Sequence, residues 1–91
     1  MARFIVVHRL PATGTQDEVI EAGKTTINAL PNDTEWLRSW VVHENARLFC
    51  EWEAQEKESI QAALKGMEIF PVEAIYPVIA IDPAWFKGST L

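Results

Sequence analysis

The chain is poor in the residues that small proteins use for crosslinks and metal sites. Its 91 residues include one cysteine, Cys50, and two histidines, His8 and His43. A single cysteine cannot form an internal disulfide, and it excludes metal sites built on paired cysteines. We therefore expect Cys50 to be a buried, reduced thiol, as is common in cytoplasmic proteins.

Positive charge and long apolar runs are also scarce. Lys and Arg number 8 against 13 Asp and Glu, which gives a net charge of -5 and a pI near 4.9. Nucleic acids and anionic membranes attract basic patches, so the sequence predicts neither as a partner. The apolar run before His8 is too short for a signal peptide, and no later run approaches the ~18 residues of a membrane span. We expect a cytoplasmic location.

Familiar catalytic motifs are missing as well. The sequence contains no Ser-His-Asp arrangement, no glycine-rich phosphate loop and no His-x-x-x-His pair. The common hydrolase, nucleotide and zinc-protease chemistries therefore have no support in the sequence. We expect the function to be binding rather than catalysis.

The composition that remains is that of one globular domain, at 48% hydrophobic and 23% charged residues. We assign it to residues 1–91, with a core of about 3–81 and a tail of 82–91. The bounds of the helices and strands follow from the spacing of apolar residues, from a Thr15–Glu18 capping box and from Pro31. We expect strands at 4–8, 34–43, 46–54 and about 72–81, with helices at about 16–30 and 56–66.

The segment from Trp36 to Glu53 predicts two antiparallel strands with a turn at Glu44-Asn45. On one face this register places Val41 opposite Leu48, Ser39 opposite Cys50 and Leu37 opposite Trp52. On the other face it places Trp40 opposite Phe49, Arg38 opposite Glu51 and Trp36 opposite Glu53. The first face is typical of a core, and the second mixes aromatic and charged residues.

The element order strand, helix, strand, strand, helix, strand predicts an α+β fold, the ferredoxin-like βαββαβ sandwich. Its four-stranded antiparallel sheet has both helices on one face, and Pro77 favours an edge position for the last strand. Gly23 costs up to about 1 kcal/mol inside a helix, which suggests either close packing against the sheet or the loss of a side chain.

Two helices leave the other face of the sheet open. We expect that face to carry Phe4, Val6, His8, Trp36, Trp40, Phe49 and Tyr76. So large an apolar patch predicts a homodimer that packs sheet against sheet, as in dimeric α+β barrels, with a partly polar pocket between the subunits.

His8 and Glu53 are the candidate metal ligands on this face. An imidazole can bind a metal or move a proton near neutral pH, although a hydrogen-bonded core histidine is the commoner role. Glu53 lacks an obvious partner, whereas Arg38 is expected to pair with Glu51. The candidate ligand-binding walls are Trp36, Trp40, Phe49 and Tyr76.

Three functions are compatible with these residues. The first is a dimeric protein that binds a small ligand or a divalent metal at the open face. The second is a cofactor-independent enzyme of the dimeric α+β barrel type, with His8 as base and Glu53 as acid. The third is a structural or partner-binding module without a ligand.

Several short motifs carry a family resemblance over about residues 4 to 78. They are Val7-His8-Arg9, Glu21-Ala22, Ser39-Trp40-Val41, Phe49-Cys50 with Glu53-Ala54, and Pro71 with Ile75-Tyr76. The order and spacing of these motifs resemble those of a family of small bacterial proteins that was formerly described as a domain of unknown function. The family includes a nickel-binding protein of dimeric ferredoxin-like fold. The resemblance implies a dimer with a divalent metal such as nickel at or near the subunit interface.

The chain also departs from that family pattern. The acidic residue and the histidines that the family commonly carries are replaced here by Val6, Gly23 and the histidine-free run 62–70. Nickel prefers imidazole together with oxygen donors, and His8 and Glu53 are the ligands that remain for it.

Overall fold

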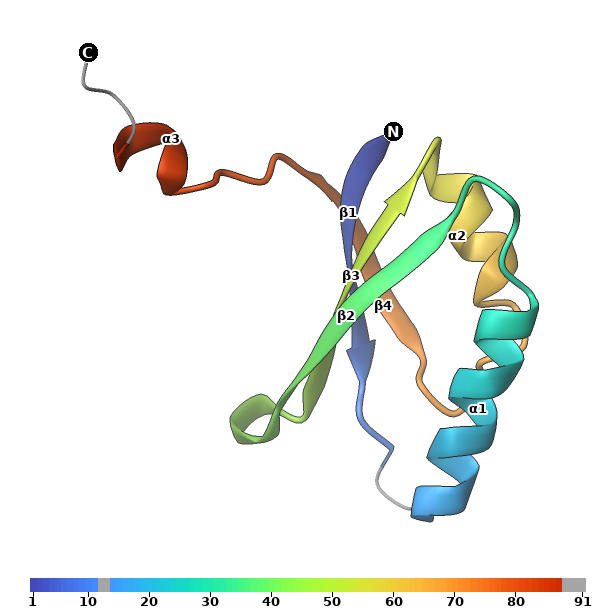
Figure 1. The fold of residues 1–91 in the computed structure, drawn as a ribbon. Coiled ribbons are helices and arrows are strands. Elements are labelled where there is room, and N and C mark those ends of the chain that lie inside the picture. The colour runs from blue at the N-terminus through green and yellow to red at the C-terminus, as the bar shows by residue number, and fades with distance from the viewer. Residues whose placement is uncertain (12–13, 88–91) are drawn as a thin grey trace.

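The computed structural model describes residues 1–11 and 14–87, and its elements follow the predicted order. These residues form β1 (Ala2–Arg9), α1 (Gln16–Asn28), β2 (Glu35–Val42), a 3-10 turn η1 (His43–Asn45), β3 (Arg47–Ala54), α2 (Lys57–Ala63), β4 (Val72–Val78) and α3 (Ala84–Lys87). The described strands make one antiparallel sheet in the order β2-β3-β1-β4. Figure 1 shows α1 and α2 on the same side of it. This is the predicted ferredoxin-like sandwich.

The start of α1 is set by its own sequence. Thr15 Oγ1 accepts a hydrogen bond from the Glu18 backbone N–H at 3.1 Å, and the Glu18 carboxylate accepts one from the Thr15 backbone N–H at 3.3 Å. This capping box satisfies donors that the first turn leaves free. The helix therefore begins where the sequence predicts.

The β2–β3 hairpin keeps most of its predicted register but not the beginning. Trp40 pairs with Phe49 and Ser39 with Cys50, as expected. A bulge at Leu37 then shifts the strand, so that Trp36 pairs with Trp52 and not with Glu53. The shift turns Trp36 to the helix side, where its ring stacks on Trp52 with centroids 5.9 Å apart. Burial of two stacked indoles favours the bulge over a regular ladder.

The predicted orientation of β1 was wrong. Val6 pairs with Cys50 and His8 with Leu48, so these β1 side chains, and Phe4 with them, lie on the helix-covered face. Both faces of β1 are apolar, because Ile5 and Val7 alternate with them, and alternation alone therefore could not orient the strand.

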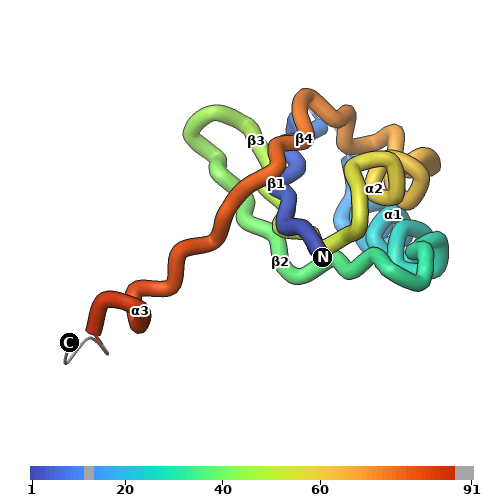
Figure 2. Tube along the Cα trace, turned by 90° about the horizontal axis from the view of Figure 1, so that it is seen from above, coloured from blue at the N-terminus to red at the C-terminus, as the bar shows by residue number. Residues whose placement is uncertain are grey.

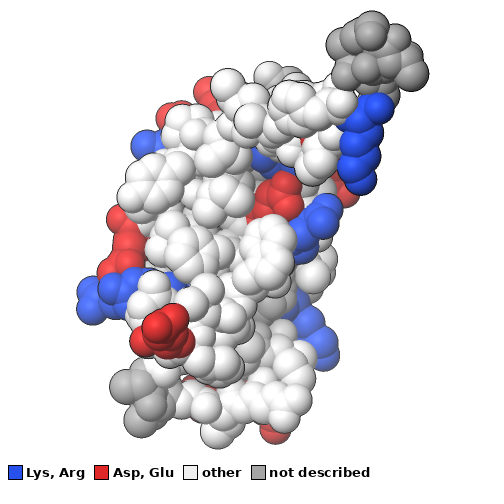
Figure 3. Space-filling view, turned by 90° about the vertical axis from the view of Figure 1, so that its left-hand side faces the viewer, with Lys and Arg blue, Asp and Glu red and all other residues white. Residues whose placement is uncertain are grey.

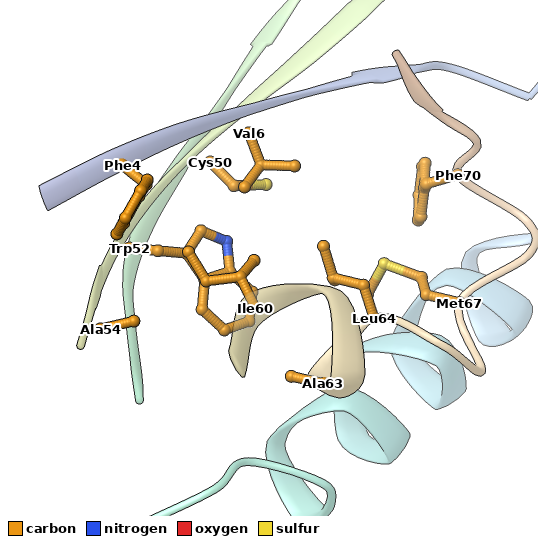
Figure 4. Close-up of a cluster of buried hydrophobic side chains, with 10 residues drawn as sticks. All are labelled: Phe4, Val6, Cys50, Trp52, Ala54, Ile60, Ala63, Leu64, Met67 and Phe70. Atoms are coloured by element: carbon orange, nitrogen blue, oxygen red, sulfur yellow. The ribbon is translucent and has the colours of Figure 1, made fainter. Parts of the chain in front are cut away.

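The core lies between the sheet and α2, as Figure 4 shows. The apolar stripe predicted for α2 and the segment after it is buried there. The core consists of Phe4, Val6, Cys50, Trp52, Ala54, Ile60, Ala63, Leu64, Met67 and Phe70.

Helix α1 is held much more loosely than α2. Of its 13 residues Thr26 alone is buried, while the apolar side chains of Val19, Ile20 and Ile27 are exposed. The helix therefore lies over the sheet without closing tightly on it.

Strand β4 is an edge strand, as Pro77 predicted. It ends at Val78, before the predicted end near Ile81, because Val78 pairs with Arg3 near the beginning of β1 and little partner strand remains beyond it. The following residues run away from the domain (Figure 1). Of the predicted tail at 82–91, residues 88–91 lie outside the described residues. Within the described part of the chain, none of the helices has the length and apolar character that a membrane crossing needs.

Candidate functional site

A cavity of about 560 Å³ lies between α1 and the sheet, a volume typical of small-molecule sites. We call it the inner cavity. His8, Trp36 and Trp52 line it from the strands, and Gly23 lines it from α1. The remaining lining residues are Leu10, Pro11, Val19, Ser39, Val41, His43, Leu48, Cys50, Leu64, Met67 and Phe70. Most of the wall is therefore apolar.

The inner cavity exists because α1 presents little side-chain volume to the sheet. A Cβ atom added at Gly23 would still be 3.9 Å from the Trp36 ring, an ordinary van der Waals distance. Close packing, one of the two predicted explanations for Gly23, is therefore wrong, and the absence of a side chain at Gly23 widens the space. Val19, Val41 and His43 are exposed lining residues, which places the mouth of the cavity between α1 and the end of β2.

His8 is the most informative side chain in the wall. Its exposed fraction is 0%, and its Nδ1 lies 3.0 Å from the carbonyl oxygen of Phe70. A carbonyl can only accept, so Nδ1 carries the proton and donates it. The other ring nitrogen, Nε2, is then an acceptor, and it has no hydrogen-bond partner among the described residues. Burial lowers the pKa of His8, partly offset by the Phe70 hydrogen bond, so the ring is neutral at neutral pH.

A second unpaired polar atom belongs to Trp52. Its indole Nε1–H is buried and finds no acceptor in the described part of the chain. The neighbouring polar groups are satisfied, since Trp36 Nε1 donates to Ser39 Oγ at 2.8 Å and Ser39 Oγ donates to Cys50 Sγ at 3.0 Å. Burial raises the pKa of the Cys50 thiol, so Cys50 is a neutral wall residue and not a nucleophile.

The inner cavity thus combines an apolar wall with two lining residues, His8 and Trp52, that each carry one buried and unpaired polar atom. Buried polar groups in proteins are nearly always hydrogen-bonded. The partner is another protein group, an ordered water or a ligand. An uncharged, mostly apolar molecule matches this wall. Among the described residues, its wall contains no Asp, Glu, Lys or Arg side chain that could stabilise a charged molecule.

The opposite face of the sheet carries the remaining predicted site residues. One row across the strands contains Trp40, Phe49, Val7 and Ala74, and the next contains Arg38, Glu51, Ile5 and Tyr76. Figure 3 looks onto this open face and shows mostly uncharged surface, with charged groups largely around it. Trp40 and Tyr76 are exposed there by 48% and 56%.

Arginine partners surround the carboxylates of the open face. Glu51 pairs with Arg3 and, at 3.0 Å, with Arg38, which confirms the predicted cross-strand ion pair. Glu53, expected to lack a partner, lies 3.8 Å from Arg3. A third carboxylate, that of Glu73, pairs with Arg47 at 2.6 Å and Arg9 at 3.4 Å.

His8 and Glu53 were predicted to act together, as two metal ligands or as a base and an acid. Within a single copy this prediction is wrong. Glu53 pairs across the ladder with Arg3, on the open face, whereas His8 is buried on the helix side. The walls are divided in the same way, since Trp36 lines the inner cavity while Trp40, Phe49 and Tyr76 face the open side. Among residues 1–11 and 14–87, no group of three or more His, Cys, Asp or Glu side chains could hold a metal ion.

Sequence reasoning missed the contributions of Gly23, Cys50 and Trp52 to one cavity. A glycine in the middle of an amphipathic helix was a usable signal, because it marks a place where the helix offers no side chain. The facing of β1 and the bulge in β2 had no such signal, and both are needed to bring His8 and Trp36 to the cavity.

The lowered pKa of His8 predicts an acid sensitivity of the fold. Because the folded state holds this proton less tightly than the unfolded state, acid favours unfolding as the pH falls below the ordinary value of 6.5. As the pH falls, the free energy of unfolding of the natural chain should decrease relative to that of a His8→Gln variant. The decrease should be no steeper than about 1.4 kcal/mol per pH unit. Urea denaturation between pH 7.5 and pH 5 measures it.

A variant that changes no titratable group provides the control for this experiment. Ile27→Ala, at an exposed position of α1, should keep the pH dependence of the natural chain. Parallel stability curves for the natural chain and the His8→Gln variant would contradict a buried, neutral His8.

Comparisons with known proteins agree with this architecture. The chain is similar to the crystal structure of SCO4226 from Streptomyces coelicolor A3(2), with a TM-score of 0.71 at 18% identity, over 89% of this chain and 100% of that chain. No curated protein sequence matches. A family model described as nickel responsive protein SCO4226-like matches residues 4–78. Since this match spans most of the sequence, the chain belongs to the SCO4226-like family of nickel-responsive proteins.

Proposed function

We propose that the protein binds a small, uncharged and mostly apolar molecule in the inner cavity, as a binding protein and not as an enzyme. The observation that carries this proposal is a mostly apolar cavity of about 560 Å³ whose lining residues include His8, with an unpaired Nε2. The predicted ligand site thereby moves from the open face to the helix-covered face.

The size of the inner cavity supports an occupant. Its volume of about 560 Å³ lies within the range of small-molecule sites, and most of its lining residues are apolar. Such a wall favours an apolar molecule over water.

The unpaired nitrogen of His8 defines the polar part of the ligand. A hydroxyl group can donate a hydrogen bond to His8 Nε2. A carboxylate cannot donate to His8, and it would lose its hydration without gaining a cation. Loosely packed α1 provides the route of entry, because few buried contacts hold it to the sheet.

Titration with 2-naphthol tests the site, with naphthalene as the matched ligand that lacks a hydroxyl. The hydrogen bond to His8 should make 2-naphthol bind about tenfold more tightly. In proton–nitrogen NMR spectra, the indole signals of Trp36 and Trp52 should shift, because both rings line the inner cavity. The signals of Trp40 and Trp85, on the open face and after β4, should stay in place.

Two variants at one position provide the controls. Gly23→Ala adds a methyl group that fits, so it should retain binding, whereas the larger side chain of Gly23→Leu enters the cavity and should abolish it. Shifts of Trp40 without shifts of Trp36 and Trp52 would place the ligand on the open face and overturn the proposal. Equal binding of 2-naphthol and naphthalene would overturn the role of His8.

We further propose that two copies pair through their open faces, as the sequence predicted. Exposed Trp40 and Tyr76 lie among the apolar side chains of Ile5, Val7 and Phe49. Monomers rarely keep such a continuous apolar face in water. In a twofold dimer the same patch contacts itself, and the arginine–carboxylate groups around it would remain paired within each copy.

A charge placed in this patch should prevent pairing. Trp40→Glu should convert a dimer into a monomer in sedimentation experiments, because each interface would bury two unpaired carboxylates. Ile27→Glu, on the outer surface of α1, should remain dimeric. A dimer that survives Trp40→Glu would exclude the open face as its interface.

Nickel is the second candidate ligand, and family membership favours it. The residues of one copy do not fit it. The imidazole of His8 lies on the opposite side of the sheet from the carboxylates of Glu51, Glu53 and Glu73, and each of these three carboxylates has an arginine partner. A divalent cation would have to compete with those guanidinium groups and would lack the imidazole that nickel prefers.

Calorimetric titration with nickel chloride should therefore give no saturable heat for the purified chain. Zinc chloride serves as a comparison, since it also takes imidazole ligands. Saturable nickel binding that disappears in Glu53→Gln but persists in Gly23→Leu would show an open-face metal site and reverse the order of the two candidate functions.

A further inference from the structure

The residues after β4 form a separate structural feature. Residues 79–87, which we call the C-terminal arm, leave the sheet at Val78 and end in the short helix α3. Figures 1 and 2 give views at right angles, and both show the arm running away from α1 and α2, on the side of the open face. The family model ends at residue 78, so the arm lies outside the part of the chain that it matches.

The arm is extended away from the domain although it is apolar. Ile79 is exposed by 89%, and Ile81, Trp85 and Phe86 are each exposed by more than 60%. The radius of gyration is 15.0 Å, compared with about 12 Å expected for a compact domain of this length. Large apolar side chains held in water on a projecting segment are typical of a contact surface.

The end of the arm has a defined local structure. Asp82 Oδ1 accepts a hydrogen bond from the Ala84 backbone N–H at 2.9 Å, and the Asp82 carbonyl accepts one from the Trp85 backbone N–H at 2.9 Å. Pro83, immediately before α3, has its backbone φ angle fixed by its ring. Trp85 is therefore presented on a preformed turn, which lowers the entropy that a contact would cost.

We propose that the C-terminal arm of each copy packs against the second copy of the open-face dimer. The five residues from Ile79 to Pro83 span up to about 17 Å when extended. Packed sheets lie about 10 Å apart, so the arm is long enough to pass the sheet of the second copy and bring Trp85 to its edge. Two arms related by the twofold axis would hold the dimer from both sides.

A second copy fits the arm better than an unrelated partner does. The arm lies on the same side of the sheet as exposed Trp40 and Tyr76, so one twofold contact covers both sets of apolar side chains. The arm itself contains one acidic residue, Asp82, and one basic residue, Lys87. It therefore offers no strong charge to select a nucleic acid or a membrane.

The proposed packing of the arm rests on the proposed open-face dimer. Sedimentation equilibrium of the full chain tests the dimer and the packing of the arm separately. The natural chain should be a dimer, and the double variant Trp85→Ala with Phe86→Ala should dissociate at least tenfold more readily, because large aromatic anchors dominate interface energies. The matched control is Ile20→Ala with Ile27→Ala, which also removes two exposed apolar side chains but on α1. It should leave the dissociation constant unchanged.

Contacts between copies give a second, direct measurement. In a mixture of isotope-labelled and unlabelled chains, filtered NMR spectra should show the Trp85 ring close to protons of the other copy. A natural chain that is monomeric would overturn the dimer and the arm together. A dimer of unchanged affinity in the arm variant, without Trp85 contacts between copies, would overturn the arm and leave the open-face dimer intact.

Discussion

Pairing between β1 and β3 is the constraint on which the remaining structure depends. The register that places Val6 opposite Cys50 directs alternate β1 side chains toward the helices, and it buries His8 completely. A shift of one residue would send the same side chains to the open face. Because β1 is central and pairs on both edges, its orientation decides which groups form the inner cavity and which remain for contact with another molecule.

The two helices then divide the covered face of the sheet. Helix α2 and the segment after it bury Ile60, Leu64 and Met67, which gives the domain its dense core. Helix α1 contributes Gly23 where a side chain would otherwise fill the space, and its own stability rests partly on the Thr15 cap. A well-packed half thus supports a loosely packed half, and a cavity forms at the boundary. Binding sites are commonly drawn from such regions of low local stability.

Family membership and local chemistry answer different questions about this protein. The chain shares its fold with SCO4226 at 18% identity, a level at which the backbone arrangement is retained while most side chains differ. A site is made of side chains, so function must be argued from them. Here the buried imidazole of His8 lies among apolar residues, and the open-face carboxylates of Glu51 and Glu53 lie among arginines. Those surroundings suit an uncharged ligand better than a metal.

The sequence alone determined the element order, the edge position of β4, the capped start of α1 and most of the hairpin register. Each follows from short-range rules of periodicity, capping and turn formation. The tertiary structure decided what those rules leave open. It turned His8 toward the helices, because a strand that is apolar on both faces has no intrinsic orientation, and it moved Trp36 to the same side through a bulge that stacks it on Trp52. The candidate site depends on both choices, since it is formed by residues far apart in the chain that only packing brings together.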